Sequence, residues 1–528
     1  MHSVSRDLPR ETMTPPPSPA RTEQQWLELV RAQILRGDSV STGVALAHAL
    51  QAFPQSFELR RILANSHRQA RRLPDAEALL RELLRENPGD VGSAFALAQL
   101  LVGQARTAAA AHVIRAFFEV SPRDPEAAIK AIELLDEIDR KGDAAVIAEQ
   151  AIVAAPDDVR LHAYAGMLQL QIGDFDLARR RYLYVMQYGA QACEWDAPLG
   201  LANAQRYGDS THPDFALLHA CLQRQDLTSK ARSGLLFSLG KAHDDIGDYP
   251  QAADYFRQAN ALAHGMTRWS RKDWRRAVEA RLSAPAIAHP LAGRDDFIPV
   301  FIVGMPRSGT TLLAELLARR PEVCNRGEMP WIARSAQQPD LAGIPEYQAL
   351  ERHSKNYRVQ TVRDDAGDAR WFIDKQPLNF RYVDLILAMF PNARIIHCLR
   401  DPSDTALSLW MQSFKEEVQG YAYDFDDIAL VTRDCGRLME HWRERFPDSI
   451  RTVRYEELIT ATHANIHALA AWIGLPANIP PSTAAPEKPV SVISTASLWQ
   501  ARQPISTRSI GRWKYYAPYI PELPGFSA

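Results

Sequence analysis

The pattern of hydrophobic and polar residues divides the chain into two parts with different predicted elements. From about residue 25 to 281 the chain has the periodicity of successive amphipathic helices. Residues 282–296 interrupt that periodicity with two prolines and a glycine and are predicted to be a linker. From residue 297 to 528, short apolar runs alternate with helical patterns, which predicts an α/β domain. Residues 1–24, which hold five prolines, are expected to form a disordered leader.

A period of 34 residues runs through the helical part. Proline recurs at this spacing, each time where a helix has to end: Pro54, Pro88, Pro122 and Pro156. Alanine recurs in the same register: Ala76, Ala110, Ala144 and Ala178. A helical bundle with accidental proline spacing is the alternative, and the shared register argues against it. The segments GDFDLARRRY and GDYPQAADYF add a Gly-Asp turn, a small residue and an aromatic residue to the pattern.

These features resemble the tetratricopeptide repeat, in which paired antiparallel helices stack into a solenoid. Residues 187–230 break the register, because Ala178 and Ala252 are 74 residues apart rather than two periods. We therefore expect an irregular or longer helical pair there. The concave groove of such a solenoid commonly binds peptides, so the resemblance implies a peptide or protein partner.

Composition and charge exclude several classes of protein. Hydrophobic residues make up 46% of the chain and charged residues 23%, as in globular proteins. A net charge of −2 gives no overall attraction to nucleic acid or to anionic lipid. The five cysteines are scattered without zinc-ligand spacing, so no metal site is expected. Without a signal-peptide core or an apolar run of about 18 residues, we expect a cytoplasmic protein with no membrane insertion.

An anion site is predicted where the linker ends. The run FIPVFIVG at 297–304 has the character of a buried parallel strand and is followed by a turn and a helix. Gly304 and Gly309 allow the tight turn, and the helix amino end attracts a phosphate-like group. Further donors lie in the same turn: Arg307, Ser308, Thr310 and Thr311. The G-x-x-x-x-G spacing also fits a kinase or nucleotide triphosphatase, but Thr310 stands where those enzymes require lysine.

The segment PRSGTTLL at 306–313 is similar to the 5′-phosphosulfate loop of sulfotransferases that use 3′-phosphoadenosine 5′-phosphosulfate (PAPS). A second segment, FPNARIIHCLRDPSDTALSLWMQSF at 390–414, resembles the 3′-phosphate motif of that superfamily. There a strand ends in arginine and the next helix presents serine, which correspond here to Arg400 and Ser408. The resemblance implies PAPS as sulfuryl donor, no metal, and a three-layer α/β/α domain with a central parallel sheet.

Two further segments resemble the tyrosylprotein sulfotransferases and their bacterial relatives. DKQPLNFRYVDLI contains Lys375, and CNRGEMPW contains Glu328 at a similar offset from the first loop as that group's proposed base. The resemblance implies Glu328 as general base, with Lys375 and Arg307 stabilising the leaving group. The tail TASLWQARQPISTRSIGRWKYY supplies expected nucleotide contacts: Ser497, Arg502 and Arg512, the last in place of the family's lysine.

The residues leave several readings open. His353 and His397 are alternative bases, although His397 lies in an apolar strand and is expected in the core. The favoured acceptor is a protein or peptide tyrosine; a carbohydrate, lipid or small metabolite is the first alternative. A repeat scaffold with a non-catalytic nucleotide-binding domain is the second, and a kinase the third. The predicted fold is α + α/β, a helical solenoid followed by the three-layer domain.

Overall fold

The computed structural model describes residues 21–120, 124–287, 289–414, 417–476 and 506–526. The chain forms two compact units, Met1–Gly103 and Gln104–Ala528. Most of the expected leader lies outside the described residues. The first helix begins at Glu23, where the Thr22 side chain accepts a hydrogen bond from the amide of Gln25 and caps the helix.

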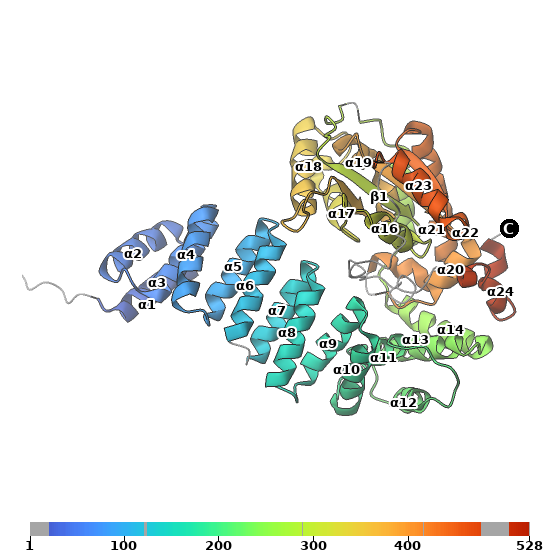
Figure 1. Cartoon of the computed structure of the whole chain (residues 1–528), viewed down its shortest axis with the longest axis horizontal. Coiled ribbons are helices and arrows are strands. Elements are labelled where there is room, and N and C mark those ends of the chain that lie inside the picture. The colour runs from blue at the N-terminus through green and yellow to red at the C-terminus, as the bar shows by residue number, and fades with distance from the viewer. Residues whose placement is uncertain (1–20, 121–123, 288, 415–416, 477–505, 527–528) are drawn as a thin grey trace, which may run out of the picture. The chain divides into compact units, whose positions relative to one another are not determined.

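The first unit consists of helices that pack as antiparallel neighbours, as Figure 1 shows in blue. They are α1 (Glu23–Leu35), α2 (Ser39–Ala52), α3 (Phe57–Gln69), α4 (Leu73–Glu86) and α5 (Val91–Gly103). Val30, Leu46 and Leu59 pack in a small core between the first three helices. Pro54 and Pro88 lie in the turns that follow α2 and α4, as the 34-residue period predicts.

The second unit begins with further helices, most of them longer than ten residues. They are α6 (Thr107–Val120), α7 (Pro125–Glu137), α8 (Lys141–Ala154), α9 (Val159–Ile172), α10 (Phe175–Tyr188), α11 (Ala197–Asn203), α12 (Pro213–Leu222), α13 (Ser229–Asp245), α14 (Tyr249–Met266) and α15 (Arg271–Leu282). Pro156 lies in a turn, whereas Pro122 lies outside the described residues. The short α11 and α12 occupy residues 187–230, where the sequence predicted an irregular or longer pair.

The alanines of the repeat register all lie at helix contacts. Ala76, Ala110, Ala144 and Ala178 each have no exposed surface. A small side chain lets the backbones of adjacent helices approach closely, so a larger residue at these positions would force the helices apart. The 34-residue period therefore reflects helix contacts that recur at the same spacing, which confirms the predicted helical solenoid.

A five-stranded sheet forms the centre of the carboxy-terminal region. Its strands are β1 (Ile298–Gly304), β2 (Val323–Asn325), β3 (Trp371–Asp374), β4 (Arg394–Leu399) and β5 (Ile450–Arg454). They lie in the order β2-β3-β1-β4-β5, and every pair is parallel. In the β1–β4 pair, Gly304 lies opposite Cys398, so both strands end at the same edge.

Helices cover both faces of the sheet. They are α16 (Thr310–Ala318), α17 (Trp331–Ala336), α18 (Tyr347–Thr361), α19 (Val383–Met389), α20 (Pro402–Trp410), α21 (Phe425–Arg445), α22 (Tyr455–Thr460), α23 (Thr462–Trp472) and α24 (Trp513–Tyr516), with 3-10 turns η1 (Pro339–Leu341), η2 (Pro377–Tyr382), η3 (Glu417–Tyr423), η5 (Thr507–Ser509) and η6 (Leu523–Phe526). Along β1, Val300 and Ile302 face the core beneath α16 and α23. Phe301 and Val303 face the larger core beneath α18 to α21. This alternation produces the expected three-layer α/β/α domain (Figure 1).

The larger core continues into the last repeat helices. Phe256 on α14 and Trp274 on α15 belong to the same buried cluster as Phe301 of β1. The Trp274 indole N–H donates to Asp434 Oδ2 at 3.0 Å, and Asn260 Nδ2 donates to the Trp410 carbonyl at 2.8 Å. The end of the solenoid and the α/β domain therefore share one hydrophobic core.

Replacing Trp442 by phenylalanine is expected to lower the free energy of unfolding of the second unit by about 1–3 kcal/mol. Trp442 is fully buried, and its indole N–H donates to the Phe380 carbonyl at 2.9 Å. The smaller ring leaves that carbonyl without this donor. Urea unfolding followed by circular dichroism measures the change. The same substitution at Trp195, which is 38% exposed, is the control and should change little.

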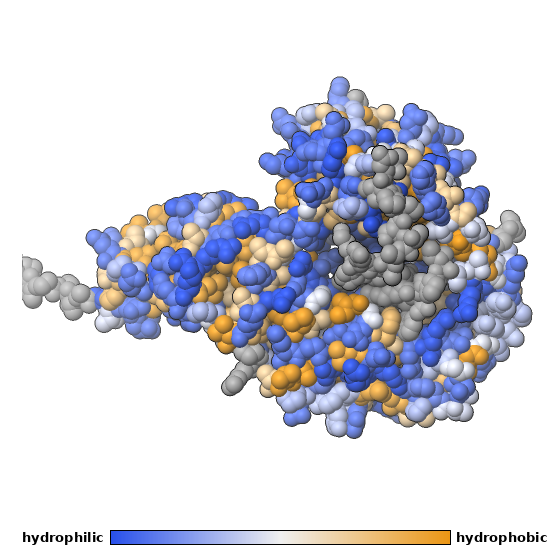
Figure 2. Space-filling model, viewed as in Figure 1, coloured by the Kyte–Doolittle hydropathy of each residue, from blue (hydrophilic) through white to orange (hydrophobic). Residues whose placement is uncertain are grey.

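On the face seen in Figure 2, hydrophilic and hydrophobic residues are interspersed. Among the described residues, the structure contains no helix that is long and apolar enough to cross a membrane.

Candidate active site

Several of the predicted site residues lie at the carboxyl ends of β1 and β4. These strands are neighbours, but the chain leaves β1 toward β2 on one side of the sheet and leaves β4 toward β5 on the other. Such a switch of direction opens a crevice beyond the strand ends, where α/β proteins bind their ligands. The loop after β1 and the amino end of α20 both border this crevice.

The loop between β1 and α16 has an unusual backbone. Gly304, Arg307 and Gly309 have φ angles of +140°, +71° and +97°. A Cβ atom on Gly304 would lie 2.4 Å from the Cys398 carbonyl oxygen, and one on Gly309 would lie 2.4 Å from the Tyr455 ring. Arg307 has a left-handed conformation that non-glycine residues seldom adopt and that is common at functional sites. The loop leads directly into α16 at Thr310, whose first-turn amides have no partner within the helix.

Arg307, Arg400 and Ser408 meet although they are distant in the sequence. Arg307 Nε donates to Ser408 Oγ at 3.0 Å, and Arg400 Nη1 donates to the Arg307 carbonyl at 3.0 Å. Burial, followed by the charges of Arg400 and Arg512, lowers the pKa of Arg307 to about 10. Burial also lowers the pKa of Arg400. Arg307 and Arg400 are therefore two cations that repel each other and are poorly solvated. A bound anion would stabilise their charges.

Two buried polar atoms at this spot have no hydrogen-bond partner among the described residues. They are Ser308 Oγ and Arg400 Nε. Both are donors, and leaving a buried donor unpaired costs about 1–3 kcal/mol. A phosphate group presents several acceptor oxygens and so suits this set of donors. The residues present therefore fit a phosphate-bearing ligand at the ends of β1 and β4.

Glu328 and Lys375 form an ion pair beside this group. The Lys375 amide donates to the Gly327 carbonyl at 2.8 Å, which places the residue after β3 next to the turn after β2. Lys375 Nζ donates to Glu328 Oε1 at 2.5 Å. The lysine side chain is 3% exposed and the glutamate side chain 29% exposed. The charge of Glu328 also acts on Arg307, so the ion pair borders the loop.

The described part of the tail adds residues that the sequence analysis missed. Arg400 Nη2 donates to the Ser509 carbonyl at 2.6 Å, and the hydroxyls of Ser509 and Tyr455 are 2.8 Å apart. The Arg400 guanidinium lies over the Tyr455 ring, 5.0 Å from its centroid. The only sequence signal for Tyr455 was its position after a strand end, where polar side chains meet in parallel sheets.

The other predicted tail residues differ in their placement. Arg512 is described and forms an ion pair with Asp244 of α13. Ser497 and Arg502 lie outside the described residues. Gly309, Thr310 and Thr311 lie where predicted, at the start of α16. The roles assigned to all these residues stay predictions.

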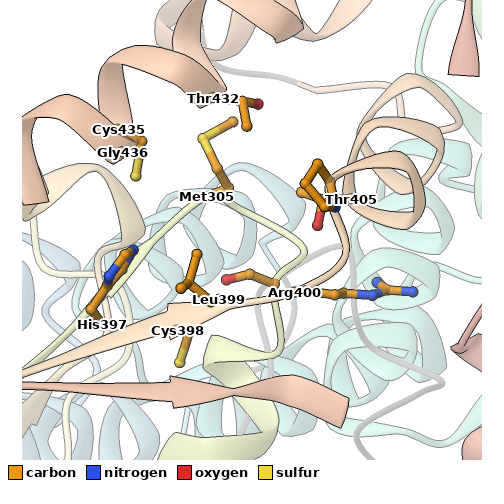
Figure 3. A pocket seen from close by; sticks show the side chains of 11 residues that line it. Met305, His397, Cys398, Leu399, Arg400, Thr405, Thr432, Cys435 and Gly436 are labelled. Carbon is orange, nitrogen blue, oxygen red and sulfur yellow. The ribbon is translucent and has the colours of Figure 1, made fainter. Parts of the chain in front are cut away.

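Neither histidine considered as a base lies in this group. His353 contacts Ser335 and Asp340, both at 3.2 Å, on the α17–α18 side of the domain. His397 is buried in β4, as its apolar surroundings predicted, and burial lowers its pKa to about 4. It lines a cavity of about 70 Å³ behind the loop, and Figure 3 shows its ring on the opposite side of β4 from Cys398.

Replacing His397 by leucine is expected to make the protein less sensitive to acid. The pKa of His397 is about 4 in the folded protein and 6.5 in the unfolded chain. Between these pH values the unfolded state therefore binds a proton at this histidine and the folded state does not. The contribution of His397 to the free energy of unfolding is therefore greatest above pH 6.5. It decreases as the pH falls toward 4, by about 3 kcal/mol in total.

The measurement is the free energy of unfolding between pH 7 and pH 4 for both proteins. Asp374, whose pKa burial raises to about 7, acts in the opposite direction, but it is present in both and cancels in the difference. Parallel pH profiles for the two proteins would contradict the prediction.

Within the described ranges, no cluster of three or more His, Cys, Asp or Glu side chains is arranged to hold a metal ion.

The sequence matches known families in two regions. Residues 299–479 match the model of the sulfotransferase family, and residues 45–91 and 95–159 match that of the tetratricopeptide repeat. An uncharacterized protein of Aquifex aeolicus is 28% identical over 332 residues, 59% of this chain and 43% of that protein. Protein-tyrosine sulfotransferase 2 of Gallus gallus is 24% identical over 201 residues, 33% of this chain and 51% of that protein.

Among solved structures, the sulfotransferase domain of the Synechococcus PCC 7002 olefin synthase has a TM-score of 0.32 and 18% identity. It covers 47% of this chain and 98% of that one. The chain spans about half the length of the curated relatives it matches.

Proposed function

Because this chain joins tetratricopeptide repeats to a domain of the sulfotransferase family, we propose that it transfers a sulfuryl group from PAPS to a hydroxyl acceptor. The observation that carries the proposal is the meeting of Arg307, Arg400 and Ser408 at the ends of β1 and β4. Their guanidinium and hydroxyl donors are sited for a phosphate dianion. Bound there, PAPS would supply the sulfuryl group and a phosphate leaving group.

In this proposal one set of residues binds the donor and stabilises the leaving group, and Glu328 activates the acceptor. The loop residues Arg307 to Thr311 hold the 5′-phosphosulfate, and Arg400 with Ser408 holds the 3′-phosphate. Lys375 donates a hydrogen bond where negative charge develops on the leaving oxygen. Glu328 accepts the proton of the acceptor hydroxyl as that oxygen attacks. The 2.5 Å contact between Lys375 and Glu328 supports this division, because it brings a cationic donor and a carboxylate together.

We propose a tyrosine side chain in a peptide or protein as the acceptor. The similarity to protein-tyrosine sulfotransferases, which spans 33% of this chain, supports a phenolic acceptor. The repeats support a polypeptide, since solenoids of paired helices bind extended segments in their groove.

Calorimetric titration of the full chain with 3′-phosphoadenosine 5′-phosphate (PAP), the desulfated product, and with ATP tests the donor. PAP is expected to bind at least tenfold more tightly than ATP, because only PAP carries the 3′-phosphate that Arg400 and Ser408 are sited to hold. Tighter binding of ATP would favour a kinase instead.

The acceptor is then tested with labelled PAPS against tyrosine peptides, carbohydrates, lipids and small phenols. Label transfer to the peptides alone would support the proposal. Transfer to another class would change the acceptor and keep the chemistry, while binding of PAP with no transfer to any class would favour a scaffold.

A further inference from the structure

The described tail, residues 506–526, joins the last repeat helices to the candidate active site. Arg512, at the amino end of α24, forms an ion pair with Asp244 near the end of α13. The Tyr516 hydroxyl donates to the same Asp244 oxygen at 2.5 Å. Asp244 therefore holds two groups of the tail at once, and both contacts connect residues more than 260 positions apart in the sequence.

Aromatic contacts hold the tail on the same pair of helices. Tyr249, the first residue of α14, stacks on Tyr515 with ring centroids 5.4 Å apart and meets Tyr516 edge to face at 5.1 Å. Arg257 of α14 also pairs with Glu522 at 3.1 Å. The ion pair of Asp244 thus belongs to a packed interface, which limits the number of positions that Arg512 can adopt.

The other side of the tail is fixed to the candidate active site. Asp404 of α20 accepts hydrogen bonds from the amides of Gly511 at 2.6 Å and Trp513 at 3.0 Å, on either side of Arg512. Arg400 donates to the Ser509 carbonyl. Because α20 also carries Ser408, the backbone around Arg512 is fixed to the same strand end and helix that present the proposed 3′-phosphate donors.

The hydrogen bonds of Asp404 and Arg400 to the backbone at 509–513 thus bring Arg512 to the site that holds Arg307 and Arg400. In addition to burial, the charge of Arg512 lowers the pKa of both arginines. Like charges tend to separate unless something holds them. Arg307 and Arg400 are fixed by Ser408 and by backbone carbonyls. The contact that fixes the Arg512 guanidinium is the carboxylate of Asp244, a residue of the repeats.

We propose that Asp244 is a positioning residue that holds Arg512 toward the nucleotide site, so that the last repeat pair, α13 and α14, is part of the PAPS-binding apparatus. The inference rests on the proposed function. It assigns to the end of the solenoid a role in donor affinity, beyond the binding of a partner. Truncating the chain between the repeats and β1 would, on this account, remove a support of the donor site.

Titration with PAP tests the inference in the full chain. Asp244→Asn is expected to weaken PAP binding about tenfold, since the guanidinium loses its charged anchor and must be ordered by the ligand. Asp254→Asn is the matched control, because Asp254 lies exposed on α14, where its carboxylate accepts a hydrogen bond from Gln258 of the same helix. The control removes the same charge and should leave PAP affinity unchanged.

A double-mutant cycle separates positioning from a merely structural role. In an Arg512→Gln background, Asp244→Asn is expected to cause no further loss of PAP affinity, because the group it positions is absent. A further tenfold loss in that background would overturn the inference, as would an unchanged or tighter affinity for Asp244→Asn alone.

Arg512→Gln by itself covers the case in which Asp244→Asn does not fold. It is expected to lower PAP affinity about tenfold, and unchanged affinity would overturn the inference. Failure of the wild-type chain to bind PAP would contradict the proposed function itself. Wild-type binding that both single variants leave intact would contradict only the role of Asp244.

Discussion

Replacing Lys375 by methionine is expected to lower the turnover number of sulfuryl transfer about 10³-fold, because it removes a donor aimed at charge that develops in the transition state. The lysine side chain is 3% exposed, and methionine has a similar length and fills the same space. PAP affinity is expected to fall by about tenfold at most, since PAP keeps the leaving oxygen as an ordinary phosphate oxygen, to which a hydrogen bond contributes less than it does in the transition state.

The measurement combines single-turnover transfer from labelled PAPS with titration by PAP. Lys355→Met, on the exposed surface of α18, is the control and should keep full turnover. If Lys375→Met kept its turnover but lost PAP affinity, the lysine would be a binding residue and the proposed division of roles would be wrong.

A substitution of Glu328 tests its role separately from that of Lys375. Glu328→Gln keeps the shape of the side chain and removes its basicity, so turnover is expected to fall about 10²-fold. The pH profile of turnover should also lose the decrease at acid pH that protonation of a carboxylate base causes. An unchanged profile would assign the base to another residue.

Replacing Arg400 by alanine is expected to weaken PAP binding by about 10²-fold or more. A charge-assisted hydrogen bond to phosphate contributes about 1.5–3 kcal/mol, and Arg400 also holds the Arg307 and Ser509 carbonyls in place. The loss therefore includes both a direct contact and the order of two neighbouring segments.

Titration with PAP and with adenosine 5′-phosphate measures this effect. The variant should lose its preference for PAP, because the two ligands differ only in the 3′-phosphate. Arg451→Ala, an exposed arginine of β5, is the control and should bind both ligands as the wild type does. A preference for PAP that survives in Arg400→Ala would place the 3′-phosphate elsewhere.

The sequence predicted the fold well because the signals involved are local. The 34-residue period reflects the packing of neighbouring helices, and Ala76, Ala110, Ala144 and Ala178 are all buried as that period requires. The strand–loop–helix from residue 298 to 318 likewise depends on an apolar run, two glycines and a helix start close together in the chain. Local backbone and packing preferences suffice for such elements.

The residues of the candidate site were also predictable as members of motifs. Their mutual arrangement was not, because it depends on contacts between segments far apart in the chain. Tyr455 lies in none of the segments that mark the family resemblance, and Ser509 was not among the candidates chosen from the tail, yet both lie against Arg400. The pairing of Glu328 with Lys375 required the turn after β2 to lie beside the end of β3, which the parallel sheet provides.

By itself, then, the sequence determined the repeats, the parallel α/β domain and which residues the loop after β1 contains. Only the tertiary structure decided that Arg307 meets Ser408, 101 residues away, and that Asp244 of the repeats meets Arg512, 268 residues away. Periodicity and propensity act over a few residues, whereas the meeting of distant side chains depends on how whole elements pack around a shared core.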